Sequence, residues 1–309
     1  MMVPMHDVIV AGGGPVGLYA AILLRQAGLD VVVLERRTVR STHSRAIGIH
    51  PPALAALESG AVSGALRARG VRITEGIARS AGRHVATLSF AATLPGEHRY
   101  VLAVPQAVTE EVLEARLETD FPGTLVRGVA VCGVSDAGTH VEVATEADGA
   151  GAVVRARLVM GADGARSAVR GFAGIRAPGR SYPDCYVMGD FLDTTDDGDA
   201  AVLYLESGGI VESFPLPGGL RRWVVRLGSP LEPTPALVAQ LIQERTGVRV
   251  DPDGNSMVSG FEVRSRLADR FISGRTVLVG DAAHEISPIG GQGMNLGWLD
   301  VGSLAPLIA

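Results

Sequence analysis

Three glycines near the start of the chain, Gly12, Gly14 and Gly17, have the spacing G-x-G-x-x-G. At this spacing the first glycine allows a tight turn, the second lets a pyrophosphate approach the backbone, and the third lets a helix lie close to a strand. Glu35 follows about 20 residues later, where an acidic side chain accepts hydrogen bonds from a ribose hydroxyl. These residue types and their spacing predict a site for an adenine dinucleotide.

A second candidate site lies near the other end of the sequence. Gly280 and Asp281 directly follow the apolar run 276–279, and open α/β sheets bind ligands at the carboxyl ends of their strands. The glycines Gly290, Gly291 and Gly293 then precede a helix that we expect to begin near Met294. Backbone N–H groups in such a turn suit an anionic or electron-rich ligand.

Several basic residues follow Glu35. For Arg37 and Arg40 we favour a solvated basic turn, which is also the simplest interpretation of Arg36. Arg45 differs because it directly precedes the apolar stretch 46–49, so its cation could meet a phosphate or an electron-rich ring.

For other polar residues the sequence leaves alternatives open. Gln106 could hydrogen-bond a cofactor, or it could cap a helix or lie at the surface. His284 could act in acid–base chemistry or pack the turn after Asp281, and one of His43 and His50 could face a substrate. The histidines show no metal-ligand spacing, so we expect no metal.

The elements that must position these residues begin with a βαβ unit. The run 7–11 reads as a buried strand, 16–27 as an amphipathic helix and 31–34 as the next strand. Further strands are predicted at 85–91, 100–104, 124–134, 141–146, 153–160 and 276–279. A helix is expected over 108–117, with Glu110, Glu111 and Glu114 facing water.

The region 175–264 has a different pattern of predicted secondary structure. Short strands alternate with turns that are rich in glycine, proline and aspartate, which predicts a mainly antiparallel sheet. The fold class is therefore α/β, with a Rossmann-like dinucleotide-binding domain and a second, mainly antiparallel sheet domain that binds the substrate. We place 1–80, 97–174 and 265–309 in the first domain, and 81–96 and 175–264 in the second.

Composition excludes several classes of function. The chain has 309 residues, 47% of them hydrophobic, with a net charge of -5 and a pI near 5.8, so we expect neither nucleic acid nor a membrane as a partner. We expect the two cysteines, Cys132 and Cys185, to be buried thiols. The absence of an N-terminal leader pattern and of a long apolar run predicts a cytoplasmic protein.

Three separated motifs together resemble one family. They are AGGGPVG with Glu35, GADGARSAVR from Gly161, and GDAAHEISPIGGQGMNLG from Gly280. In this order they resemble the class A flavoprotein monooxygenases, the family of p-hydroxybenzoate hydroxylase and the aromatic polyketide hydroxylases. The stretches HSRAIGIHP and VPQAVTEEVLEARL are also similar to the family's pattern.

The resemblance implies a cofactor, FAD, and a role for each matching residue. Glu35 would bind the adenosine ribose, with Arg36 beside it, and the turn Gly12–Gly17, including Pro15 and Val16, would bind the pyrophosphate. Arg45 and Gln106 would contact the diphosphate and ribityl side, and Asp163 would contact both flavin and nicotinamide. The remaining implied contacts are Gly280 and Asp281 at the ribityl chain, Gly291 and the backbone of Gly293, Met294 and Asn295 at the ring, and Pro288 at its reacting face.

The resemblance also implies a reaction. NAD(P)H, bound transiently, would reduce FAD; O2 would add to the reduced ring at C4a, and the hydroperoxide would hydroxylate a phenolic or polycyclic aromatic metabolite. Arg45, Pro288 and His284 are the candidate catalytic residues. The alternatives are a related FAD-dependent reductase or halogenase, or a truncated flavin-binding remnant.

Family members continue further than this chain, which ends at Ala309. We therefore expect a shortened C-terminus, and an apolar face left uncovered there would favour a homodimer.

Overall fold

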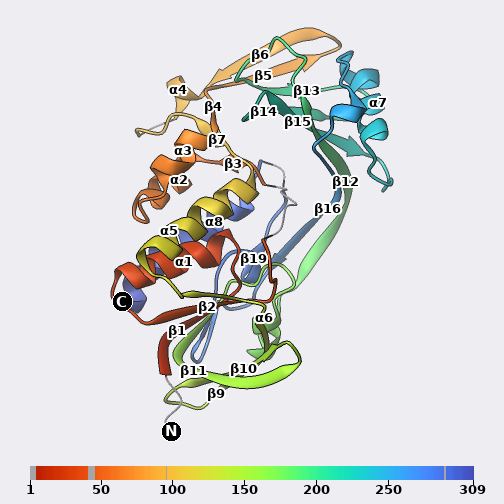
Figure 1. Cartoon of the computed structure of the whole chain (residues 1–309). Helices are drawn as coiled ribbons and strands as arrows, with labels where there is room; N and C mark the ends of the chain where they lie inside the picture. The colour runs from red at the N-terminus through yellow and green to blue at the C-terminus, as the bar shows by residue number, and fades with distance from the viewer. Residues whose placement is uncertain (1–4, 41–45, 95, 289) are drawn as a thin grey trace.

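The computed structural model describes residues 5–40, 46–94, 96–288 and 290–309, and it contains two large sheets and one small one. Figure 1 shows the first sheet with its helices at one end of the molecule and the second sheet at the other. Two long strands of the second sheet, β12 (Gly179–Leu192) and β16 (Met257–Leu267), run along the side of the molecule between these two ends.

The first sheet has a parallel centre, as the sequence predicted. Strand β1 (Met5–Ala11) lies between β11 (Ala150–Gly161) and β2 (Val31–Glu35), and all of these pairings are parallel. Strands β18 (Thr276–Leu278) and β8 (Leu125–Arg127) extend this order on the two sides, also in parallel. Further strands add antiparallel edges: β9 (Ala130–Asp136), β10 (Val141–Ala147) and β17 (Ile272–Ser273).

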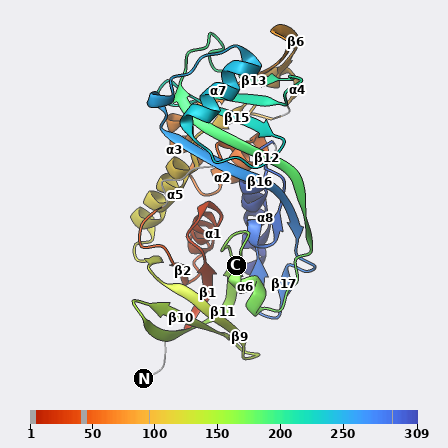
Figure 2. The same ribbon diagram turned by 90° about the vertical axis from the view of Figure 1, so that its right-hand side faces the viewer.

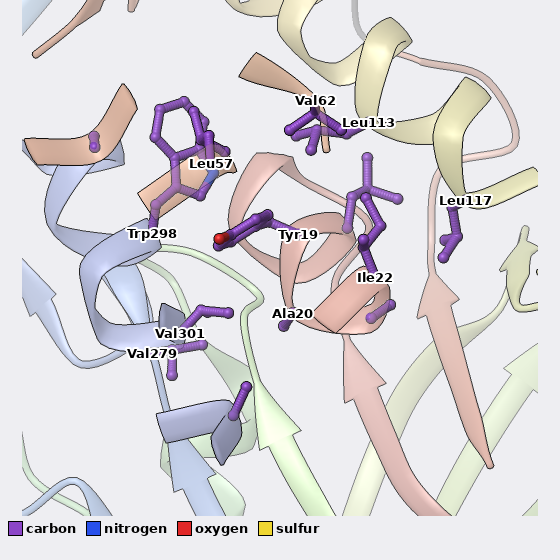
Figure 3. Packing of buried hydrophobic residues seen from close by; sticks show 14 of the residues in the cluster. Tyr19, Ala20, Ile22, Leu57, Val62, Leu113, Leu117, Val279, Trp298 and Val301 are labelled. Carbon is purple, nitrogen blue, oxygen red and sulfur yellow. The ribbon is translucent and has the colours of Figure 1, made fainter. Parts of the chain in front are cut away.

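Helix α1 (Pro15–Gln26) connects β1 to β2 and is the centre of the largest core. It packs against α5 (Gln106–Asp120) and α8 (Gly293–Ile308), which come from distant parts of the sequence. Figure 3 shows Tyr19 and Ile22 of α1 among side chains of these helices, with Trp298 of α8 nearby. The Trp298 indole N–H donates to the Pro15 carbonyl oxygen at 3.1 Å. This contact ties α8 to the first turn of α1.

The second sheet is mainly antiparallel, which confirms the prediction for the region 175–264. Its strand order is β19-β16-β12-β15-β14-β13-β5-β6, and only β13 and β5 pair in parallel. Its other strands are β19 (His284–Glu285), β15 (Leu220–Leu227), β14 (Val211–Leu216), β13 (Ala201–Tyr204), β5 (Glu75–Ser80) and β6 (Arg83–Ser89). Helix α7 (Pro235–Thr246) covers one face of this sheet over Trp223 and Val225. The opposite face carries residues that line a cavity.

Short elements complete the fold. A third sheet consists of β3 (Gly48–Ile49), β7 (Val101–Ala103) and β4 (Val71–Ile73). The small helices are α2 (Pro51–Glu58), α3 (Ser63–Arg69), α4 (Phe90–Thr93) and α6 (Ala168–Phe172), with 3-10 turns η1 (Pro252–Gly254) and η2 (Gly280–Ala282).

Four details differ from the expectations. The predicted strand 124–134 is two strands, because Gly128 has a φ of 76° and turns the chain between them. Residues 75–80 pair within the second sheet as β5, although the expected division placed them in the first domain. Cys132 is exposed, because it lies on β9 near the sheet edge, whereas Cys185 is buried as expected. Glu110 is buried, as described below.

Candidate functional site

One large cavity of about 770 Å³ brings the two ends of the molecule together. Its lining includes the glycine turn after β1, the N-terminal side of α8 and the inner face of the second sheet. In Figure 2, α1 and α8 lie side by side below the strands of that sheet. The cavity therefore joins residues that are far apart in the sequence.

The glycine turn has the geometry that the three-glycine spacing predicted. Gly12 has a φ of 109°, and a Cβ atom there would lie 2.5 Å from the Ala162 carbonyl oxygen. A Cβ atom on Gly17 would lie 2.0 Å from the Gly12 carbonyl oxygen, so the helix can approach the turn only without a side chain. Gly14 differs, because a Cβ atom on it would meet nothing within 4 Å. Gly14 thus leaves bare backbone beside open space in the cavity.

Glu35 is buried at the end of β2, with 6% of its surface exposed, and it lines the cavity. Its carboxylate accepts hydrogen bonds from the Gly13 N–H at 2.7 Å and the Arg37 N–H at 2.9 Å. A carboxylate offers about four acceptor positions, so these two bonds leave capacity for ribose hydroxyls.

Gln106, at the start of α5, also lines the cavity. Its side-chain amide donates to the Glu110 carboxylate at 2.8 Å. The expectation that Glu110 faces water was wrong, because only 6% of its surface is exposed and it too lines the cavity. Burial raises the pKa of Glu110, and the hydrogen bond from Gln106 opposes that rise. The amphipathic pattern alone cannot distinguish a helix face that meets water from one that meets a cavity.

Asp163 lines the cavity just beyond the end of β11. Its Oδ2 atom accepts from the N–H groups of Ala168 and Val169 at 2.7 and 3.1 Å, which holds the first turn of α6. Its Oδ1 atom is buried and has no hydrogen-bond partner among the described residues. A buried acceptor without a partner is costly, and a ligand hydroxyl would satisfy it.

Asp281 lies in turn η2 after β18 and lines the cavity. Its side chain is open to the cavity, but the protein around that cavity raises the pKa of Asp281 by desolvation. The neighbouring Gly280, with a φ of 59°, packs against Val16 of α1 and is buried. A Cβ atom on Gly293 would lie 3.5 Å from Asp281 Oδ1, so the carboxylate lies beside the N-terminus of α8.

The segment before α8 forms the adjoining wall. Pro288, Gly291, Gly293 and Met294 line the cavity, and the Gly291 N–H donates to the Pro288 carbonyl oxygen at 2.9 Å. Asn295 is buried behind this wall. Its side chain accepts from the His50 N–H at 2.8 Å and donates to the carbonyl oxygens of Gly48 and Gly291 at 2.9 and 2.7 Å.

His284 does not line the cavity. Its Nε2 atom is 2.6 Å from Asp300 Oδ2, and the same oxygen accepts from the Gly280 N–H at 2.9 Å. The hydrogen bond with Asp300 raises the pKa of His284. This geometry favours the packing alternative, in which His284 and Asp300 hold the turn that carries Asp281.

The remaining polar residues singled out in the sequence divide into three groups. Arg36 and Arg37 both line the cavity, so the turn after Glu35 is more than a solvated basic segment. His50 lines the cavity, its Nε2–H donates to the Gly290 carbonyl oxygen at 2.8 Å, and burial lowers the pKa of its ring. Arg45 and His43 lie outside the described residues.

The sheet side of the cavity was not found from the sequence. Its lining includes Tyr186, Met188, Glu212, Phe214 and Phe261. Strand register cannot be fixed from one sequence, and a shift of one residue would exchange the inner and outer faces.

The described residues fit FAD. The open side of Gly14 leaves room for a pyrophosphate at the N-terminus of α1, where the helix dipole favours negative charge. The unpartnered Asp163 Oδ1 atom offers an acceptor for a hydroxyl group. No group of three or more histidine, cysteine or acidic side chains in the described ranges could hold a metal ion.

This fold and site define a dinucleotide-binding protein with a second sheet over the same cavity. A family model described as "FAD binding domain" matches residues 5–309. The chain belongs to this family, and FAD is the cofactor. This match, together with the relatives described next, confirms the resemblance to class A flavoprotein monooxygenases.

Named relatives are monooxygenases. The chain is 34% identical to a rifampicin monooxygenase of Streptomyces venezuelae over 97% of this chain and 63% of that protein. It is 32% identical to 6-methylpretetramide 4-monooxygenase of Streptomyces rimosus over 97% of this chain and 55% of that protein. A solved structure of p-nitrophenol 4-monooxygenase from Pseudomonas putida has a TM-score of 0.90 and 28% identity, covering 99% of this chain and 80% of that one.

The chain thus spans about three fifths of the length of the two Streptomyces relatives. Within the part of the chain that the structure describes, no helix is both long and apolar enough to cross a membrane.

Proposed function

We propose that this chain is the catalytic part of an FAD-dependent monooxygenase that hydroxylates an aromatic metabolite with NAD(P)H and O2. The observation that carries the proposal is that one cavity is lined by the glycine turn at one end and by Tyr186, Phe214 and Phe261 at the other. A dinucleotide and an aromatic ring can therefore meet within one cavity. The names of the relatives, which include a rifampicin and a p-nitrophenol monooxygenase, support the same class of substrate.

In this proposal the first sheet and its helices hold the cofactor. The pyrophosphate binds at the glycine turn and the start of α1, beside Gly12, Gly14, Pro15 and Val16. Gly17 has no side chain, so α1 can pack close to this turn. Glu35 accepts from the ribose of the adenosine.

Further contacts follow along the cavity toward the second sheet. Gln106 and Asp163 offer polar groups beside the middle of the dinucleotide, and Arg36 lies near its adenosine end. Asp281 accepts hydroxyl groups of the ribityl chain. The first helical hydrogen bond at this end of α8 is donated by the Leu296 N–H to the Gln292 carbonyl oxygen. The N–H groups of the first three residues of the helix therefore have no partner within α8; these residues are Gly293, Met294 and Asn295. These N–H groups suit the electron-rich edge of the flavin.

Bound FAD would supply the redox chemistry, by accepting a hydride from NAD(P)H and activating O2. The chain itself orients the aromatic ring and excludes water from the reacting groups. Pro288 and Gly291 contribute a wall without polar side chains. Arg45 remains a candidate from the sequence.

We retain the two-domain division as part of the proposal, with β5 assigned to the substrate-binding sheet together with β6. A homodimer also remains an expectation, which sedimentation velocity tests directly.

The test is NADPH and NADH oxidation by the purified FAD-loaded protein, with and without a panel of phenols and polycyclic aromatics, followed by mass spectrometry of the products. The proposal expects at least one aromatic compound to stimulate oxidation and to gain one oxygen atom that originates from 18O2. FAD binding without stimulation or product by any panel member would contradict the hydroxylase and leave a flavin-binding unit.

A further inference from the structure

One acidic side chain on the second sheet is not used by the proposed cofactor site. Glu212 lies on β14, where it pairs in register with Leu203 of β13 and Val224 of β15. Directly paired residues of neighbouring strands point to the same face of a sheet. Glu212 and Val224 both line the cavity, so the carboxylate is on the inner face.

The Glu212 carboxylate has no hydrogen bond or ion pair with any residue that the structure describes, although the side chain is half-buried. Three other carboxylates of the cavity have protein partners, whereas Asp163 Oδ1 and Asp281 are assigned to the cofactor. Glu35 holds backbone N–H groups, Glu110 holds Gln106, and Glu262 pairs with Arg264 at 2.9 Å. The Glu212 carboxylate oxygens are open to the cavity, so a ligand in the cavity can reach an acceptor that no protein group occupies.

One arginine on the same face, Arg222, is already paired with another carboxylate. Arg222 lies opposite Phe214 on β15, two residues from Val224. Its guanidinium forms a paired contact with Asp190, with distances of 2.7 Å from Nε to Oδ1 and 2.8 Å from Nη2 to Oδ2. The positive charge of Arg222 is therefore balanced by Asp190 and not by Glu212.

The surroundings of Glu212 are flat and apolar. Tyr186 and Phe261 stack with their ring centroids 5.2 Å apart and their planes 8° apart, and Met188 and Phe214 lie on the same inner face. Such surfaces suit an aromatic ring. Burial raises the pKa of Glu212, in keeping with a carboxylate that lacks a compensating charge.

We propose that Glu212 is a specificity-determining residue that accepts a hydrogen bond from a donor substituent of the aromatic substrate and rejects aromatic carboxylates. The donor can be a phenolic hydroxyl or a protonated amine, because both present hydrogen to an acceptor-only group. An aromatic acid would place a second negative charge in an apolar space, which is unfavourable. This inference rests on the proposed function, since it names the substrate class of the same cavity.

Isothermal titration calorimetry of the FAD-loaded protein tests the inference without any turnover. The probes are 2-naphthol, 2-naphthylmethylammonium and 2-naphthoate, which share one ring system and differ in the polar group. The variants are Glu212→Gln and Glu212→Leu. Glu244→Gln serves as the control, because Glu244 is an exposed carboxylate on α7, which covers the opposite face of the sheet.

In the wild type we expect at least one of the two donor probes to bind about tenfold or more tightly than 2-naphthoate, the scale of a hydrogen bond to a charged group. Glu212→Leu should abolish that preference, and Glu244→Gln should keep it. Glu212→Gln separates the two donors: it retains part of the naphthol affinity through its amide oxygen, but it loses the affinity that depends on the ammonium charge.

Equal affinity of the wild type for all three probes, or an unchanged preference in Glu212→Leu, would overturn the inference while the proposed function stands. Wild-type protein that binds FAD but none of the three ring compounds would overturn the inference, whereas the proposed function fails only if no member of the turnover panel is oxidised.

Discussion

The Glu35 carboxylate holds the N–H groups of Gly13 and Arg37 at the nucleotide end of the cavity. In Glu35→Gln one acceptor oxygen is replaced by a donor amide, so the ribose hydroxyls and the backbone N–H groups compete for fewer acceptor positions. We expect FAD affinity to fall by about 1–3 kcal/mol, the cost of poorly paired polar groups. Fluorimetric titration of the apoprotein measures it. Glu118→Gln, an exposed carboxylate on α5, should leave the affinity unchanged, and an equal loss in both variants would refute a specific role.

The hydrogen bond between His284 and Asp300 predicts how the stability of the protein depends on pH. The Asp300 carboxylate raises the pKa of His284 above its ordinary value of 6.5 in the folded protein. The folded state therefore binds this proton more tightly than the unfolded state does. The resulting stabilisation is complete below about pH 6.5 and is lost as the pH rises through the raised pKa.

Thermal unfolding of wild type and His284→Gln across this range tests the linkage. The Tm difference between the two proteins should be largest at the acidic end of that range and should shrink above neutral pH. A difference that does not vary with pH would show that the imidazole carries no linked proton.

At the residue scale, the sequence predicts contacts that depend on local backbone geometry. Gly12, Gly14 and Glu35 lie within one βαβ unit, so their spacing along the chain sets their positions in space. Glu110 and Glu212 were missed because their environments are made by other elements. Each lies on an ordinary helix or strand, and only the packed fold shows that its side faces a cavity.

At the scale of elements, two glycines of the same turn have separable roles. Gly17→Ala places a methyl group against the Gly12 carbonyl oxygen and should destabilise the protein by about 1–3 kcal/mol through overpacking. Gly14→Ala places its methyl group in open space, so we expect a stability loss of about 1 kcal/mol or less and a clear loss of FAD affinity. Urea unfolding of the apoprotein and FAD titration measure the two effects. Loss of stability without loss of FAD affinity in Gly14→Ala would contradict the assignment.

Helices and strands could be predicted wherever the hydrophobic periodicity of a segment and its flanking turn residues indicate the same element. The βαβ unit, α5 and the antiparallel sheet of region 175–264 appear as expected, because each carries its own pattern. The split between β8 and β9 was missed because it depends on the pairing of β8 with β2, a parallel neighbour that is remote in sequence. The role of α5 as a cavity wall was missed for the same reason.

At the scale of the whole molecule, function depends on the return of the chain after the second sheet. Strand β18 returns to the first sheet beside β11, and α8 then packs on α1 with its N-terminus at the cavity. The motifs predicted that both segments contact one ligand. They could not predict which face of the second sheet lies over that ligand, since strand register decides the face.

Every functional role assigned to these residues depends on FAD binding in this cavity along the glycine turn. Titration of the apoprotein with FAD, followed by flavin fluorescence, measures that binding in the wild type and in the double variant Gly14→Ala/Glu35→Gln. We predict saturable wild-type binding at one FAD per chain and binding weaker by about tenfold or more in the double variant, a change of about 1.4 kcal/mol or more. No saturable binding in the wild type, or the same affinity in both proteins, would contradict the claim.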